Sequence, residues 1–160
     1  MHNQIARYVW RVDEELLLRH QVCFALHNAA RAANALYRPL LDPLGLTYPQ
    51  YLVLLLLWER DGRTVGELGT ALDLDSGTLS PLLKRLEGAG LVTRERSAGD
   101  ERVVEVHLTP GGTALRRRAR KIPATLATAT GLSTAELSTL HSTLTRLAGS
   151  LRESATPTKG

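Results

Sequence analysis

The sequence predicts a mainly α-helical protein with one small β-hairpin near its middle. Over most of the 160 residues, apolar side chains recur at the spacing that one face of a helix requires. Residues 91–108 break this period, because apolar and polar residues alternate there on both sides of the turn-forming stretch "SAGD" at 97–100. We expect helices, one hairpin and helices again, within a single domain of residues 1–160.

The composition indicates a globular domain without a membrane partner. The chain is 43% hydrophobic and 22% charged, which argues against both disorder and a membrane class. Its most apolar run, "YLVLLLLW", ends at Glu59 and is far shorter than the roughly 20 residues of a membrane span. No apolar signal core follows Met1. We therefore expect a cytoplasmic protein.

Charge and cysteine usage exclude some classes of site. The net charge of +4 comes almost entirely from arginine, which fits a polyanionic partner but fits a GC-rich genome equally well. Cys23 is the only cysteine, so an internal disulfide is excluded. The five histidines are scattered without metal-ligand spacing, and we expect no metal or other cofactor.

A long first helix is predicted to begin at Asp13, a candidate cap, and to run until Pro39 and Pro43. A stripe of small and apolar side chains follows one face of it, including Leu16, Cys23, Leu26, Ala30, Ala33 and Tyr37. A helix of this length seldom buries its whole stripe within one small domain. Residues 13–46 are therefore expected to serve mainly in dimerisation.

Three helices are predicted between residues 47 and 90. The first has Thr47 as its cap, is apolar on nearly all sides and ends near Gly62, as expected of a buried central helix. The second is short and starts with Thr64 and Glu67 at capping-box spacing. The third is predicted to be capped by Ser76 and to end at the glycines 88 and 90, with leucines on one side and hydroxyl and basic residues on the other.

The hairpin that follows, at about residues 91–108, carries Arg94, Arg96 and Arg102 around a short turn. Two short helices followed by a basic hairpin are the element order of a winged helix-turn-helix, here at 47–109. The alternative is an ordinary solvated helix and hairpin. If this region binds DNA, we expect the contacts to come from the polar side of the third helix and from the hairpin, namely from Ser76, Gly77, Thr78, Ser80, Lys84, Arg85, Arg94, Arg96, Asp100 and Arg102. Asp100 is two residues before Arg102, and we expect these two side chains to form an ion pair.

Helical spacing returns at 110–152. The last helix is predicted to be capped by Ser133, with Glu136 at the third position, and to reach about Leu151. These helices are expected to be dimerisation helices, like the N-terminal one.

At this point the chain shows a specific resemblance. The stretch "LDLDSGTLSPLLKRLEGAGLVTRERSAGDERVVEVHLTPGG", with "DER" at 100–102, resembles the winged-helix core of the MarR family of bacterial repressors. Upstream, "VCFAL" and "YRPLLDPLGLTYPQYLVLLLLWE" are similar to its organic-hydroperoxide-sensing branch, OhrR. The resemblance covers about residues 13–120. It implies a homodimeric repressor, not an enzyme, that binds a palindromic double-stranded DNA operator and leaves it when its cysteine is oxidised by organic hydroperoxides.

The resemblance also implies a sensor site. In such proteins two tyrosines hydrogen-bond the reactive sulfur, and their motif positions here are Tyr37 and Tyr48, with Cys23 as the redox sensor. A phenol that donates to sulfur favours the thiolate. On one continuous helix, Cys23 and Tyr37 would lie roughly 20 Å apart, so the tyrosines that reach a given sulfur are expected to come from the partner subunit.

One position departs from the family pattern. His27 stands where the resemblance leads us to expect a third tyrosine, and it is either a donor to the sulfur or a satisfied interface histidine. Without a second cysteine, the sulfenic acid is expected to be captured by a low-molecular-weight thiol as a mixed disulfide, or to proceed to sulfinic or sulfonic acid.

Two rival functions remain open from the sequence. One is a MarR-type regulator that senses a phenolic or lipophilic ligand non-covalently near Phe24, Leu54 and Trp58, with Cys23 structural. The other is a thiol peroxidase, against which stand the missing resolving cysteine and the absence of any oxyanion cradle.

Overall fold

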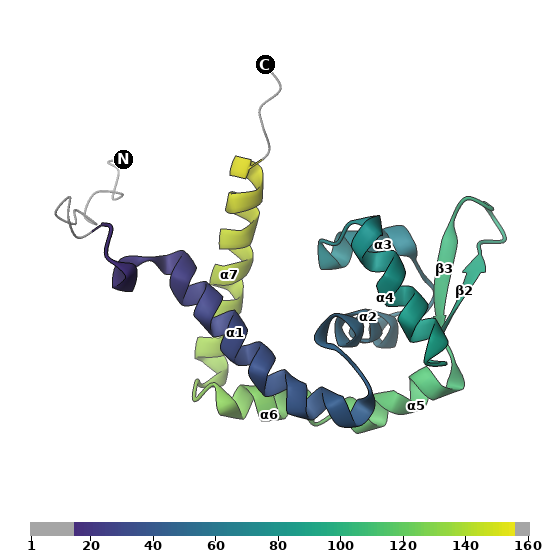
Figure 1. The fold of residues 1–160 in the computed structure, drawn as a ribbon, viewed down its shortest axis with the longest axis horizontal. Helices are drawn as coiled ribbons and strands as arrows, with labels where there is room; N and C mark the ends of the chain where they lie inside the picture. The colour runs from purple at the N-terminus through teal and green to yellow at the C-terminus, as the bar shows by residue number, and fades with distance from the viewer. Residues whose placement is uncertain (1–14, 156–160) are drawn as a thin grey trace, which may run out of the picture. The chain divides into compact units, whose positions relative to one another are not determined.

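The computed structural model describes residues 15–155, and the chain divides into two compact units after Arg116. The fold is mainly helical with one small three-stranded antiparallel sheet, as predicted. Figure 1 shows the helices and the hairpin of the first unit. The segment limits expected from the sequence, 13–46, 47–109 and 110–152, remain predictions.

The first long helix, α1, spans Val22–Leu41 and begins later than predicted. The proposed cap Asp13 lies outside the described residues. Before the helix, a short 3-10 helix at Leu18–His20 is followed by Gln21, whose backbone is extended and whose side-chain amide donates to the carbonyl of Glu15 (2.5 Å). This local hydrogen bonding competes with helix formation, and α1 starts only after it. At the other end, α1 continues through Pro39 for two more residues.

The predicted central helix is α2, which spans Tyr48–Glu59. Its start is fixed by Gln50, whose side-chain oxygen accepts a hydrogen bond from the backbone N–H of Thr47 (2.9 Å). Four of its apolar side chains are almost completely buried, namely Tyr51, Val53, Leu54 and Leu57. The helix ends shortly before Gly62, whose φ of 69° is a conformation that glycine adopts without strain.

Two helices follow, α3 at Val65–Leu72 and α4 at Ser76–Gly88. The capping box of α3 is confirmed, because the Glu67 carboxylate accepts from the Thr64 backbone and the Thr64 hydroxyl accepts from the Glu67 backbone (2.7 and 3.1 Å). The predicted cap of α4 is wrong by one residue. Asp75, not Ser76, accepts from the backbone N–H of Thr78 (2.9 Å), and this bond lowers the pKa of Asp75.

The hairpin consists of β2 (Val92–Arg96) and β3 (Val104–Leu108), paired antiparallel with Val92 opposite Leu108. A third strand, β1 (Arg63–Thr64), pairs with the other edge of β3, and its two residues are too few to give a periodic signal. Figure 1 shows α4 beside this hairpin. The wing is thus anchored on one side to the helix-turn-helix.

The expected Asp100–Arg102 ion pair is not formed. Asp100 instead accepts from the backbone N–H of Arg102 (3.0 Å), which closes the turn of the hairpin. The reason is that β3 begins only at Val104, so Arg102 belongs to the turn and its side chain does not share a strand face with Asp100.

Helix α5 (Pro110–Ala119) follows the hairpin and packs tightly at Gly112. The Gly112 carbonyl accepts a hydrogen bond from the indole N–H of Trp58 in α2 (2.9 Å). A Cβ at this position would lie 2.1 Å from the carbonyl oxygen of Leu91. Glycine is therefore required here for the close approach of α5 to the root of the wing.

The second unit contains α6 (Ile122–Ala129) and α7 (Thr134–Ala155). The predicted cap of the last helix is confirmed, since the Ser133 hydroxyl accepts from the backbone N–H of Glu136 (3.3 Å) and the Glu136 carboxylate accepts from the backbone N–H of Ser133 (2.8 Å). The helix extends past Leu151. None of the α7 residues is buried. No single helix within residues 15–155 is long and apolar enough to cross a membrane; the bent pair Val22–Leu44 and Tyr48–Glu59 passes together on length and composition alone.

Candidate nucleic-acid interface and redox site

Helix α4 has one buried and one exposed face, as a DNA-reading helix requires. Its buried side chains are Leu79, Leu82, Leu83 and Leu86. The exposed face carries the predicted DNA contacts Ser76, Gly77, Thr78, Ser80, Lys84 and Arg85. The small residues are in the first turns, where a helix end can approach base edges, and the two cations follow one turn later, within reach of phosphates.

The wing adds the arginines 94, 96 and 102, all of them exposed. They are not equivalent. Arg94 is bound to Glu87 of α4 by its side chain, whereas Arg96 and Arg102 form no ion pair within residues 15–155. The sequence pattern predicted the same role for all three arginines, because it does not show that Glu87, seven residues before Arg94, contacts only Arg94.

Helix and wing residues surround a common cavity of about 480 Å³. Ser80 of α4, Arg94 of β2 and Arg102 of the turn all line it, together with residues at the start of α3. The structure therefore brings together candidate DNA contacts from two separate elements. Within the part of the chain that is described, no three His, Cys, Asp or Glu side chains are placed to hold a metal ion.

Cys23 is exposed and lies in the first turn of α1. The first turn of a helix has unpaired backbone N–H groups that favour a nearby negative charge. His27 is exposed one turn further along the same helix. This position of Cys23 was not predicted, because the expected cap, Asp13, is ten residues before the cysteine.

Two of the predicted sensor residues, Tyr37 and Tyr48, lie side by side. Their ring centroids are 4.5 Å apart, and the ring centroid of Tyr51 lies 6.0 Å from that of Tyr37. Burial, reinforced by these two neighbours, raises the pKa of Tyr37 to about 12. Tyr37 is therefore a neutral phenol near pH 7 and can donate a hydrogen bond.

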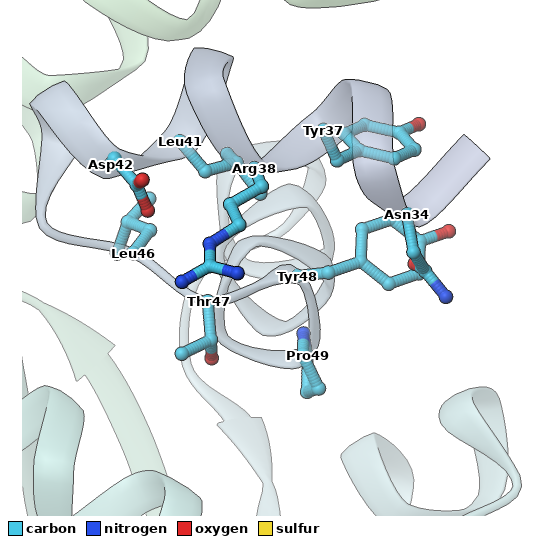
Figure 2. Close-up of a pocket in the computed structure, with 9 residues that line it drawn as sticks. All are labelled: Asn34, Tyr37, Arg38, Leu41, Asp42, Leu46, Thr47, Tyr48 and Pro49. Atoms are coloured by element: carbon cyan, nitrogen blue, oxygen red, sulfur yellow. The ribbon is translucent and has the colours of Figure 1, made fainter. Parts of the chain in front are cut away.

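The tyrosine pair borders a cavity of about 500 Å³ between the end of α1 and the start of α2. Figure 2 shows both rings at one end of this cavity and the Arg38 side chain between the two helices. A ligand pocket was expected near Phe24, Leu54 and Trp58, but none of these three residues lines this cavity. Leu54 is core, and Trp58 packs edge-on against Tyr51 at 6.3 Å.

The structure does not bring Cys23 to the tyrosines within one chain. Cys23 and Tyr37 are fourteen residues apart on one continuous helix, which separates them by roughly 20 Å. The predicted sensor residues therefore form two separate groups: Cys23 lies at the start of α1, and Tyr37 lies near its end, beside Tyr48 of α2.

Comparison with known proteins gives a consistent family. Residues 35–117 match the family model described as transcriptional regulator SarA/Rot. The chain is 46% identical over 140 residues to the organic hydroperoxide resistance transcriptional regulator of Bacillus subtilis (strain 168), covering 88% of this chain and 95% of that protein. These relatives are transcriptional regulators, not enzymes.

Solved structures agree with this assignment. The crystal structure of AbfR of Staphylococcus epidermidis is 35% identical, with a TM-score of 0.73 over 88% of this chain and 97% of that one. Reduced AbfR bound to DNA matches with a TM-score of 0.72 at 36% identity, over 87% and 97% of the two chains. A disulfide-formed AbfR matches less well, with a TM-score of 0.62 at 35% identity, over 88% and 94%. The chain belongs to the MarR family of winged helix-turn-helix DNA-binding transcriptional regulators, in the branch of organic hydroperoxide resistance regulators.

Proposed function

We propose that this regulator is a cytoplasmic homodimeric repressor that binds a palindromic operator and is released when organic hydroperoxides oxidise Cys23. The observation that supports this proposal most is that the two parts of the proposed sensor lie at opposite ends of α1. A pair of tyrosine rings in contact borders a cavity at one end of the helix, and the chain's one cysteine is exposed at the other.

Two copies of α1 packed antiparallel about a two-fold axis bring the two parts of the sensor together. Cys23 of one chain then meets Tyr37 and Tyr48 of the partner subunit, and the same arrangement applies at the second site. This packing also covers apolar side chains that a single chain leaves exposed, such as Val22 and Phe24. His27, one turn from the sulfur, takes the place of a third phenol and donates from its ring.

The proposed chemistry begins with the Cys23 thiolate. Its sulfur attacks one oxygen of the hydroperoxide; an S–O bond forms, the O–O bond breaks and the organic part leaves as an alcohol after taking a proton. A low-molecular-weight thiol then attacks the sulfenic acid, which gives a mixed disulfide and water. Hydrogen bonds from the neutral phenols favour the thiolate that starts this sequence.

Release from DNA follows from the size of the added group. A mixed disulfide within a packed helix interface forces the two subunits to shift, which changes the distance between the two copies of α4. These helices must match half-sites about 34 Å apart on the operator. A hundredfold loss of affinity requires only about 2.8 kcal/mol, which is within reach of one or two disrupted buried contacts.

The test is operator binding at fixed salt, measured for wild type and Cys23→Ser with and without a stoichiometric organic hydroperoxide and a thiol. We expect both proteins to bind when untreated and only the wild type to be released. Release of the serine variant, or continued binding of the treated wild type, would show that Cys23 is not the sensor.

The cavity at Tyr37 and Tyr48 also favours a second candidate, a regulator that binds a phenolic or lipophilic ligand there without covalent chemistry. That function predicts reversible release of operator DNA by the ligand, with equal effect on wild type and on Cys23→Ser.

A further inference from the structure

Glu87 of α4 and Arg94 of the wing form an ion pair on the DNA-binding side of the molecule. Glu87 is the penultimate residue of α4, and Arg94 is the central residue of β2. One carboxylate oxygen of Glu87 accepts from Nε and Nη2 of Arg94, at 3.0 and 2.6 Å. The other oxygen accepts from the backbone N–H of Arg94 at 3.2 Å. A single acid thus holds both the backbone and the side chain of one wing residue.

We propose that Glu87 and Arg94 form a clamp that fixes the wing relative to the recognition helix, and that Arg94 is a positioning residue and not a DNA contact. This inference rests on the operator binding described above, although not on the redox chemistry of Cys23. It assigns Arg94 a different role from Arg96 and Arg102.

The surrounding structure explains why such a clamp is needed. Only Val92, the first residue of β2, is buried, and the four residues after it are exposed. The connection from α4 to β2 passes through Gly90, which has a φ of 69°. Among the ion pairs of residues 15–155, the one that joins β2 to α4 is that between Arg94 and Glu87.

The chemistry of the pair also limits what Arg94 can offer to DNA. The Nε edge of its guanidinium, which would form a forked contact with a phosphate or a guanine, is occupied by the Glu87 carboxylate. The hydrogen bonds from Arg94 lower the pKa of Glu87, so the carboxylate stays ionised at neutral pH. The pair is therefore close to neutral, and it attracts phosphate less than Arg96 or Arg102 does.

The sign of one substitution separates the two roles. Removal of a negative charge from a DNA-binding surface normally strengthens binding, because repulsion of the phosphates is lost. If Glu87 is a clamp, Glu87→Gln instead weakens operator binding, by about threefold to tenfold. Glu95→Gln is the matched control on the same strand, because Glu95 forms no ion pair within residues 15–155; it should leave binding unchanged or strengthen it.

Arg94→Lys is the complementary variant, since lysine keeps the charge but loses the fork. We expect it to weaken binding as much as Glu87→Gln does, and the double variant to show no further loss. Arg94→Gln should leave the slope of log affinity against log salt unchanged, whereas Arg96→Gln should reduce it by about one.

The measurement uses reduced protein without peroxide and a DNA duplex that the wild type selects from a random pool, so its outcome does not depend on whether Cys23 is the sensor. Thermal unfolding of each variant checks the fold. Stronger binding by Glu87→Gln, or full affinity in Arg94→Lys together with a reduced salt slope in Arg94→Gln, would overturn the clamp and return Arg94 to the DNA contacts.

Discussion

The winged part of the chain and the helix α1 differ sharply in how much they bury. Residues of the winged part such as Leu68, Leu86 and Val106 are completely buried by their own chain. In contrast, α1 has twenty residues, and only Leu41 at its end is buried, while Val22 is 65% exposed and Phe24 40%. The winged part thus has its own core within one chain, whereas most of α1 is left uncovered, which supports the dimer proposed above.

The same difference extends to the chemistry. The clamp, the capping boxes and the turn of the wing all form within one chain. The proposed sensor does not, because Cys23 lies in the first turn of α1, whereas Tyr37 lies near its other end beside Tyr48 of α2. Full burial of a large apolar side chain contributes about 1.5 to 3 kcal/mol, so the exposed apolar side chains of α1 would stabilise the proposed pairing with a second copy of α1.

The largest expected effect tests the completeness of the winged part. Gly112→Ala places a methyl group 2.1 Å from the Leu91 carbonyl oxygen, which no side-chain rotation relieves. We expect a loss of more than about 4 kcal/mol in the free energy of unfolding, or no folded protein. Gly88→Ala is the control, because a Cβ there meets nothing within 4 Å. Equal thermal stability of the two variants would contradict this close packing.

A medium effect compares the two regions directly. Leu86→Ala opens a cavity in the winged core and should lower the free energy of unfolding by about 2 to 5 kcal/mol at any protein concentration. Phe24→Ala should mainly weaken the dimer, because this ring is partly exposed in one chain. Its unfolding temperature should therefore fall most at low protein concentration. A concentration-independent loss in Phe24→Ala would place that ring in the core of a single chain.

The smallest effect concerns the place where α1 does find partners in its own chain. The pKa of Tyr37 is raised to about 12, so the folded protein holds this proton more tightly than the unfolded chain does. Stability should therefore be unaffected near pH 7 and fall as the pH rises from about 10 towards 12. Burial also raises the pKa of Tyr51, so alkaline absorbance titration should show more than one late phenol, with the one near pH 12 missing in Tyr37→Phe. Titration of all tyrosines near pH 10 would contradict the buried pair.

Local signals predicted most of the secondary structure. The capping box at Thr64 and Glu67 and the alternation in the wing involve near neighbours in the chain, and both are confirmed. The errors occurred where two local options compete. Asp75 and Ser76 are both good caps, and the side chain of Gln21 favours a turn over an earlier helix start.

Contacts between distant residues could not be derived from periodicity. The resemblance selected Tyr37 and Tyr48, but only the folded chain shows that their rings lie 4.5 Å apart beside a cavity. The pairing of Glu87 with Arg94 was missed altogether. It depends on the direction in which the chain turns at Gly90, which the sequence pattern does not specify.

The central claim is that each sensor site is built from two chains, and a mixed dimer tests it most directly. One protomer carries Cys23→Ser and keeps both tyrosines; the other keeps Cys23 and carries Tyr37→Phe with Tyr48→Phe. The rate of Cys23 oxidation by an organic hydroperoxide is compared with that of the double-phenylalanine homodimer, which should be about tenfold slower than wild type. We predict the wild-type rate in the mixed dimer, because its cysteine faces the intact tyrosines of the other chain; the slow rate of the homodimer would contradict a sensor shared between chains.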